Sequence, residues 1–227
     1  MSGGVRQEQS SRGPTLRQSL SVAAAVGAYA ISFGALSVAA GLTVAQTCAL
    51  SLLMFTGGSQ FAFVGVVGAG GTPVAAAATA ALLGARNGLY GLQMAPVLGA
   101  TGLRRLAAAH VTIDESTAVA TAQPTARLRR LGFWVTGTAV FVLWNLMTLT
   151  GAVVGDALGD PRRYGLDAAA AAAFLGLVWP RLREGSARAV AAGAVVVAAA
   201  LTPIAPAGLP VLAAAAVAVV VGWRTRS

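Results

Sequence analysis

The sequence predicts an all-α polytopic membrane protein, a helical bundle of six full spans plus one broken or re-entrant segment. Of its 227 residues, 56% are hydrophobic and only 10% are charged, whereas a soluble domain carries about 25% charged residues. Several apolar stretches reach the length of about 20 residues that a helix needs to cross the hydrocarbon layer. These stretches also lack the regular polar–apolar alternation that is typical of strands.

The N-terminal part of the chain predicts a tail followed by the membrane domain. Residues 1–18 are rich in Gly, Ser, Gln and Arg, a composition typical of disordered segments. We therefore expect a disordered cytoplasmic tail over 1–18 and the membrane domain over 19–227. Ser19–Ala40 is the first predicted span. The sequence Gly41-Leu42-Thr43 then predicts a helix stop followed by a new N-cap.

The second apolar segment, Val44–Gly68, contains Gly57-Gly58 near its middle, followed by Ser59 and Gln60. Two adjacent glycines in an apolar run favour an unwound point, so this segment is the predicted broken or re-entrant one. The N-terminus of a half-helix exposes free backbone N–H groups, which suit a carboxylate. The alternative is that the glycines only allow neighbouring helices to approach closely.

The third segment, Val74–Leu98, carries Arg86 at its centre with Asn87 beside it. Tyr90 and Gln93 share a helix face with Arg86 through their i+4 and i+7 spacing. A charge at that depth in a membrane is costly and normally faces a cavity or a partner. A guanidinium group binds carboxylates through two parallel hydrogen bonds. Alternatively, backbone carbonyls satisfy the arginine, or it extends to the membrane surface.

The long connection over residues 99–130 is polar and holds Asp114 and Glu115, the only acids between Glu8 and Asp156. The spacing Thr112-x-x-Glu115 matches a capping box at a helix start. The alternative is that Asp114 or Glu115 forms a gate or a proton relay.

The second half of the chain predicts four further segments: Leu131–Gly155, Leu166–Trp179, Ala187–Leu201 and Leu209–Trp223. Asn145 near the middle of the first either bonds across helices or faces a pathway. The last three are mostly Ala and Val, which indicates either a scaffold or a surface for another helix. A weak internal repeat is suggested because Gly165-Leu166-Asp167 precedes a helix as Gly41-Leu42-Thr43 does.

Basic residues predict the orientation of the chain. The net charge is +9, and nearly all the arginines lie in the tails or between apolar runs, as residues that set membrane topology do. This placement argues against nucleic-acid binding. The arginine-rich segments all lie on the same side of the membrane if one of the first three apolar segments does not cross it. The broken Val44–Gly68 segment is the natural choice for this segment. We then expect a cytoplasmic N-terminus.

The sequence does not indicate an enzyme or a cofactor. It contains one cysteine, Cys48, and one histidine, His110, so neither an internal disulfide nor a histidine-based metal cluster is expected. Motifs for a nucleophile–base pair or a phosphate-binding loop are also absent.

Several motifs occur in the order that is typical of one transporter family. The chain resembles the azaleucine-resistance (AzlC-like) branched-chain amino acid permeases. The resemblance rests on Phe55-Thr56-Gly57-Gly58-Ser59-Gln60-Phe61, Arg86-Asn87-Gly88-Leu89-Tyr90-Gly91-Leu92, Asp114-Glu115-Ser116 and Val178-Trp179-Pro180-Arg181-Leu182. It implies export of leucine, isoleucine, valine or analogues, together with a small AzlD-like membrane partner.

The combined expectation is a plasma-membrane secondary transporter for hydrophobic amino acids, driven by the proton gradient. The alternatives are a structural or assembly subunit without its own pathway, and a channel. Phe55, Phe61 and Met94 are expected to receive the aliphatic end of the substrate, and Asp114 or Glu115 to gate the site or relay protons. The predicted substrate-binding residues are Gly57, Gly58, Ser59, Gln60, Arg86, Asn87, Tyr90 and Asn145.

Overall fold

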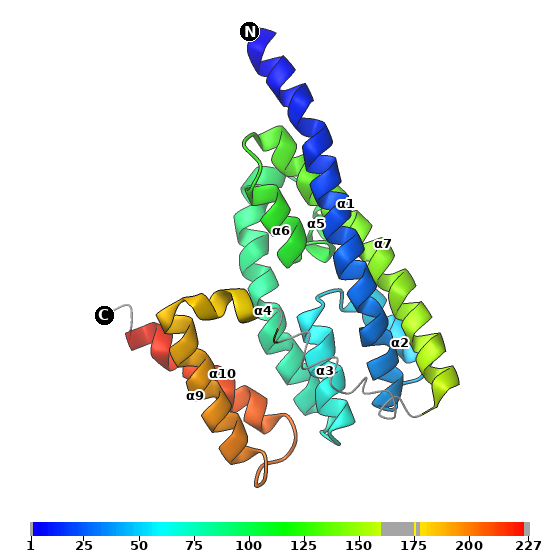
Figure 1. Ribbon diagram of the computed structural model, residues 1–227, viewed down its shortest axis with the longest axis vertical. Coiled ribbons are helices and arrows are strands. Elements are labelled where there is room, and N and C mark those ends of the chain that lie inside the picture. Colours follow the sequence, from blue (N-terminus) through cyan, green and yellow to red (C-terminus); the bar gives the residue numbers. More distant parts are fainter. Residues whose placement is uncertain (1, 160–174, 176–177, 225–227) are drawn as a thin grey trace.

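The computed structural model describes residues 2–159, 175 and 178–224, and all regular structure in these residues is helical (Figure 1). The predicted all-α class is confirmed. Most of the predicted segment Leu166–Trp179, with the suggested repeat at 165–167, lies outside the described residues. The elements are α1 (Ser2–Ala39), α2 (Val44–Leu53), α3 (Gly58–Gly68), α4 (Pro73–Leu98), α5 (Gly102–His110), α6 (Asp114–Thr121), α7 (Ala126–Leu158), η2 (Trp179–Arg183), α9 (Gly185–Leu201) and α10 (Leu209–Arg224).

Helices α1 and α7 form the parallel pair around which the other helices pack. A Cβ at Gly34 would meet the backbone of Thr148 and Ala152, and a Cβ at Gly151 would meet the backbone of Ile31. Glycines on both helices therefore let the two backbones approach closely. Contacts further along connect Gly155 of α7 with α1 near its C-terminal end. At these contacts the residue numbers of α1 and α7 increase together, so the two helices run in the same direction.

Two described helices are long and apolar enough to cross a membrane: Arg12–Ala39 and Ala126–Leu158. Helices 44–53, 58–68, 185–201 and 209–223 are also apolar but shorter. The predicted number of six full spans is therefore not confirmed and stays a prediction.

The predicted break in the second apolar segment is confirmed. Helix α2 ends at Leu53 and α3 begins at Gly58, and Gly57 between them has φ +48°. A backbone at this φ suits glycine because other residues rarely adopt it. Helix α3 returns to the end of the bundle where α2 began, since a Cβ at Gly68 would lie 3.2 Å from Cβ of Ala40. Helices α2 and α3 therefore form a hairpin that doubles back.

The polar connection between residues 99 and 130 contains a second helical hairpin, which the sequence did not predict. Helix α5 starts beside the N-terminal part of α7, where Arg104 lies 5.6 Å from the ring of Trp134. The turn after α5 then reaches Gly137, whose Cβ would lie 3.0 Å from Val111. Helix α6 runs back until Val119 faces Gly132. This hairpin enters the bundle from the end opposite to α2–α3.

Helices α1–α3 and α4–α6 are therefore two copies of one arrangement with opposite orientation. Each copy is a long helix followed by a hairpin of two short helices (Figure 1). The two hairpin tips meet near the middle of α7, where the rings of Phe55 and His110 lie 6.0 Å apart and each packs on Phe141. Inverted repeats of this kind occur in many secondary transporters.

An aromatic cluster fixes α3 against α1 and α7 beneath the tips. The ring of Phe61 stacks on Tyr29 at 4.9 Å and meets the edge of Phe33 at 5.4 Å. Trp144 closes the cluster and is only 2% exposed. Burying rings of this size stabilises the position of the α3 N-terminus strongly.

Helix α1 begins before the predicted span. Residues 12–18 are helical and contact the α6–α7 connection, in place of the disordered tail that their composition predicts. Thr15 Oγ1 donates to Gln123 Oε1 at 2.8 Å, and Gln123 Nε2 donates to Gln18 Oε1 at 3.0 Å. The composition misleads here because these polar side chains bond to one another in a tertiary contact.

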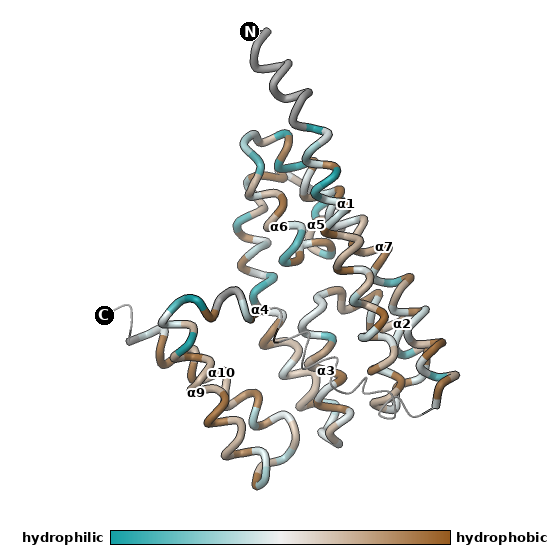
Figure 2. The backbone as a smooth tube through the Cα atoms, in the orientation of Figure 1, coloured by the Kyte–Doolittle hydropathy of each residue, from teal (hydrophilic) through white to brown (hydrophobic). Residues whose placement is uncertain are grey.

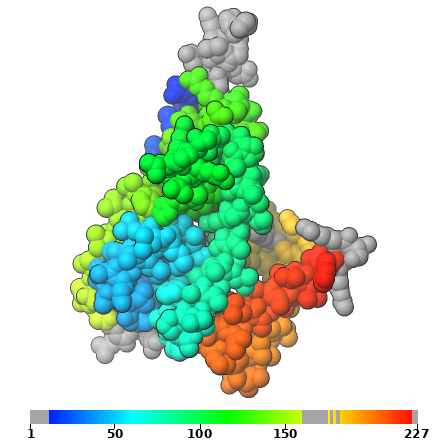
Figure 3. Space-filling model, turned by 180° about the vertical axis from the view of Figure 1, so that it is seen from behind, coloured from blue at the N-terminus to red at the C-terminus, as the bar shows by residue number. Residues whose placement is uncertain are grey.

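The C-terminal helices α9 and α10 pair with each other and stand beside the lower part of α4 (Figures 1 and 3). Their connection contacts the main bundle at Gly208, whose Cβ would lie 3.0 Å from Cβ of Ala75. An apolar cavity of about 640 Å³ lies between this connection and helices α3 and α4.

The close packing of α1 on α7 predicts that Gly151→Leu will destabilise the fold. The added side chain would overlap the Ile31 carbonyl, and overpacking of this kind typically costs about 1–3 kcal/mol. We expect a lower thermal unfolding midpoint for the purified protein in detergent. Gly91→Ala is the control, since its Cβ would meet nothing within 4 Å. An unchanged midpoint for Gly151→Leu would contradict this packing.

Candidate binding site between the two hairpins

A cavity of about 80 Å³ lies where the two hairpin tips meet helices α1, α4 and α7. Both tips contribute to it, as do the first residues of α3 and α6. The lining residues are Val26, Tyr29, Phe55, Thr56, Gly57, Gly58, Arg86, Asn87, Ile113, Asp114, Glu115, Val140 and Trp144. The site thus combines one cation and two acids with apolar walls.

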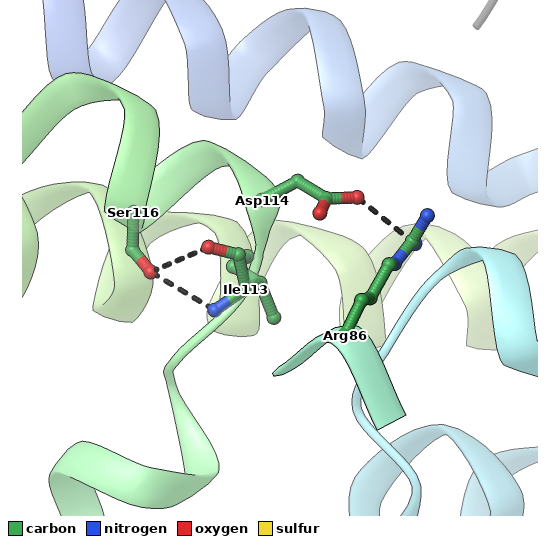
Figure 4. A network of polar contacts seen from close by, with 4 residues as sticks. All are labelled: Arg86, Ile113, Asp114 and Ser116. Atoms are coloured by element: carbon green, nitrogen blue, oxygen red, sulfur yellow. Dashed lines mark hydrogen bonds and ion pairs between the residues drawn. The ribbon is translucent and has the colours of Figure 1, made fainter. Parts of the chain in front are cut away.

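An ion pair between Arg86 and Asp114 joins α4 to the start of α6 (Figure 4). Arg86 Nη2 lies 2.9 Å from Asp114 Oδ2, and each side chain is 36% exposed. This pair balances the arginine charge in the middle of α4, which would be costly without a partner at that depth in a membrane. It also positions the second hairpin against the long helix of its own repeat.

The ion pair leaves one polar atom unused on each partner. Arg86 Nε and Asp114 Oδ1 are both buried, and within the described residues neither has a hydrogen-bond partner. Four more polar atoms of lining residues share this condition: Tyr29 Oη, Thr56 Oγ1, Asn87 Oδ1 and Trp144 Nε1. Buried polar atoms nearly always have partners in folded proteins, so this concentration indicates a site that a polar ligand or water completes.

The N-termini of α3 and α6 both face the cavity, from opposite ends of the bundle. The first N–H groups of a helix have no partner within that helix, and they carry a partial positive charge. Gly58 is the first residue of α3, and a Cβ there would lie 3.0 Å from Arg86 Nη2. The missing side chain therefore lets the guanidinium approach the α3 N-terminus, and together they form an anion-attracting corner.

The structure brings six of the ten predicted site residues together. Gly57, Gly58, Arg86, Asn87, Asp114 and Glu115 line the cavity. Ser59 is 1% exposed, and its Oγ faces α4 near Gly84. Tyr90 lies one turn beyond Arg86 on α4 and is outside the cavity lining.

Gln60 and Asn145, also predicted to bind substrate, use their amide groups within the fold. Gln60 Nε2 donates to the carbonyls of Leu50 and Ser51, each at 3.4 Å, near the C-terminal end of α2. These bonds tie the two arms of the first hairpin together. Asn145 Nδ2 donates to the Phe141 carbonyl at 2.8 Å, one turn earlier in α7.

The predicted capping box at Thr112 and Glu115 is wrong by one residue. Thr112 Oγ1 donates to the Ala108 carbonyl at 2.7 Å and so satisfies the end of α5. The N-cap of α6 is Ile113, whose amide donates to Ser116 Oγ at 3.0 Å, and that hydroxyl donates to the Val111 carbonyl at 2.7 Å. Ser116, and not an acid, thus caps α6 (Figure 4), and both Asp114 and Glu115 line the cavity.

Sequence reasoning missed several lining residues. Tyr29 and Trp144 are ordinary aromatic residues of apolar helices, and only the tertiary structure places them at the hairpin tips. Phe55 lines the cavity as expected, but the other two residues expected at the aliphatic end do not. Phe61 packs under the cavity on Tyr29, and Met94 is 1% exposed in a separate core with Phe133.

Glu115 is the second acid of the cavity and lies outside the two helices that are long enough to cross a membrane. Loss of contact with water raises the pKa of its carboxyl group, and the charge of Asp114 adds to the rise. A backbone hydrogen bond and the charge of Arg86 oppose this rise in the pKa. Because desolvation dominates, Glu115 keeps its proton to a higher pH than an exposed glutamic acid does.

Comparison with known proteins identifies one family. The family model described as AzlC protein matches residues 21–158, which include both hairpins and every residue that lines the cavity. No curated protein and no solved structure matches the chain.

Substitutions at the two adjacent glycines of the first hairpin tip, Gly57 and Gly58, should be unfavourable for different reasons. Gly57→Ala forces a side chain onto a backbone with φ +48°, a strain that costs about 1–3 kcal/mol. Gly58→Ala has an ordinary backbone but pushes against the Arg86 guanidinium. We expect Gly57→Ala to lower the unfolding midpoint more than Gly58→Ala, measured on purified protein. Equal midpoints would contradict the strained turn.

Proposed function

The chain belongs to the AzlC family, and we propose that it is a secondary transporter that exports branched-chain and other hydrophobic amino acids. The family supports a role in branched-chain amino acid transport in a membrane. Direction of transport, coupling to protons and a partner subunit are parts of our proposal. The observation that carries it is the cavity between two inverted hairpins, where Arg86 lies beside the N-terminus of α3.

The cavity offers suitable surroundings for both ends of a hydrophobic amino acid. The Arg86 guanidinium and the α3 N-terminus suit the carboxylate. Val26, Phe55 and Val140 line the same cavity and provide an apolar wall for the aliphatic side chain. A volume of about 80 Å³ is only about half that of a cavity that binds benzene. The substrate therefore requires the hairpins to separate, and we assign this conformation to a closed form of the carrier.

The inverted hairpins suggest how the site opens to each side in turn. Each tip covers the cavity from one end of the bundle, so movement of one hairpin exposes the site to one side only. Alternating exposure of a site at the interface of two inverted repeats is a common mechanism in secondary transporters.

The distribution of arginine supports a cytoplasmic N-terminus. Arg104, Arg127 and Arg130 lie at the end of the bundle that holds the α6–α7 connection, where hydrophilic residues concentrate (Figure 2). Arginine-rich ends of membrane proteins face the cytoplasm. We accordingly propose a multi-pass protein of the plasma membrane with this end inside the cell.

A small AzlD-like membrane protein is the partner that we propose from the family resemblance. Leu89 and Leu92 on α4 are 67% and 75% exposed, and Leu103 and Leu106 on α5 are 84% and 67% exposed. Each of these exposed apolar side chains is one that either lipid or partner helices can cover. Transport should therefore be measured with and without the co-expressed partner.

Arg86→Gln tests the proposed carboxylate site. Removing the guanidinium takes away the charged group that binds the substrate, so export of labelled leucine or valine from vesicles should fall at least about tenfold. Arg105→Gln, on the exposed surface of α5, is the matched control and should transport normally. Leucine export by Arg86→Gln at the wild-type rate would refute the assignment, and passive leak in place of saturable transport would indicate a channel.

Glu115→Gln tests proton coupling. The variant mimics the protonated carboxyl group, so leucine–leucine exchange should continue while a pH gradient no longer drives net leucine flux. In the wild type, exchange should decline as the pH rises through the raised pKa, because ionised Glu115 adds a second negative charge beside Asp114 and repels the substrate carboxylate. Exchange by the variant should not show this decline. Unchanged gradient-driven flux in Glu115→Gln would remove Glu115 from the coupling mechanism.

A further inference from the structure

We propose that Asp114 binds the ammonium group of the substrate and, in the empty site, takes the place of the substrate carboxylate on Arg86. This inference rests on the proposed function and adds the residue that recognises the ammonium group of the amino acid. Asp114 is thus a specificity-determining residue in addition to its role in holding the hairpin.

The first argument is the incomplete pairing of the two charged side chains. A guanidinium and a carboxylate can form two parallel hydrogen bonds, but Arg86 and Asp114 form a single close contact of 2.9 Å between Nη2 and Oδ2. Arg86 Nε remains a buried donor and Asp114 Oδ1 a buried acceptor, both without a partner within the described residues. A ligand that presents an acceptor and a donor together satisfies both atoms.

The second argument is the charge balance of the cavity. An α-amino acid carries a carboxylate and an ammonium group on the same carbon atom, so it can replace the single ion pair by two pairs without changing the net charge. A carboxylic acid without the ammonium group would displace Asp114 from Arg86 and leave it unpaired. An amine without the carboxylate would leave Arg86 unpaired. Leaving one of these partly exposed charges inside the helical bundle without its partner is unfavourable.

The third argument is the correspondence between the two hairpins. Gly58 is the first residue of α3 and Asp114 is the first residue of α6, so the inverted repeat places them at equivalent positions on either side of the cavity. One position exposes backbone amides beside Arg86, which suit a carboxylate. The other provides a carboxylate, which suits an ammonium group.

Three probes that share one carbon skeleton test the inference: leucine, its 2-oxo acid 4-methyl-2-oxopentanoate, and 3-methylbutylamine. Binding to the purified full chain is measured by calorimetry. The wild type should bind leucine at least about tenfold more tightly than either probe that lacks one charge, because each loses a charge-assisted hydrogen bond.

Asp114→Asn should reverse this preference. Arg86 is then released from its internal partner, so the 2-oxo acid should bind about tenfold more tightly than it does to the wild type, while leucine should bind about tenfold more weakly. Asp156→Asn, an exposed carboxylate at the end of α7, is the matched control and should behave as the wild type. The unfolding midpoint of each variant is measured to confirm that it is folded.

The outcomes separate this inference from the proposed function. Equal affinity of the wild type for leucine and the 2-oxo acid would overturn the inference alone. If the folded Asp114→Asn variant binds leucine and the 2-oxo acid more weakly by the same factor, the inference is also overturned, because Asp114 would then act only through the fold. Failure of the folded wild type to bind leucine would overturn the proposed function together with the inference.

Discussion

The contact between Arg86 and Asp114 is the interaction on which the rest of this structure depends. An arginine in the middle of α4 requires a counter-charge, and the ion pair with Asp114 supplies it from the tip of the second hairpin. The contact fixes the depth at which that hairpin ends. It also places the guanidinium beside the α3 N-terminus, where the absence of a side chain at Gly58 makes room for it. One charge pair thus brings both hairpins to the same cavity.

The parts of the fold that the sequence predicted are those where one residue violates its local pattern. Gly57-Gly58 interrupts an apolar run and Arg86 interrupts another, and the structure has the break and the central arginine where these residues predict them. The second hairpin was missed because its segment is polar and reads as a loop. Val111 and Val119 of this segment pack on glycines of α7. These contacts are tertiary, so the local sequence pattern does not reveal the two helices.

The predicted site residues line the cavity where charge or backbone freedom decided the position of a residue, and lie elsewhere where hydrogen bonding decided it. Gln60 is a polar residue in an apolar helix, as Arg86 is, but its amide nitrogen donates to two carbonyls at the end of α2. Ser116 similarly replaces Thr112 in capping α6, because the end of α5 uses the Thr112 hydroxyl. The sequence gives the number of donors and acceptors but not their partners, so such assignments require the fold.

The inverted repeat is hidden in the sequence because the two hairpins carry different chemistry at equivalent positions. If both tips carried glycine, the cavity would attract anions from both ends and Arg86 would have no internal partner. If both carried an acid, the substrate carboxylate would be repelled. The observed combination, with Gly58 opposite Asp114 around one arginine, gives a cavity with one anion-attracting and one cation-attracting corner. A symmetric scaffold with unequal tips is therefore the arrangement expected of a carrier whose substrate has two different ends.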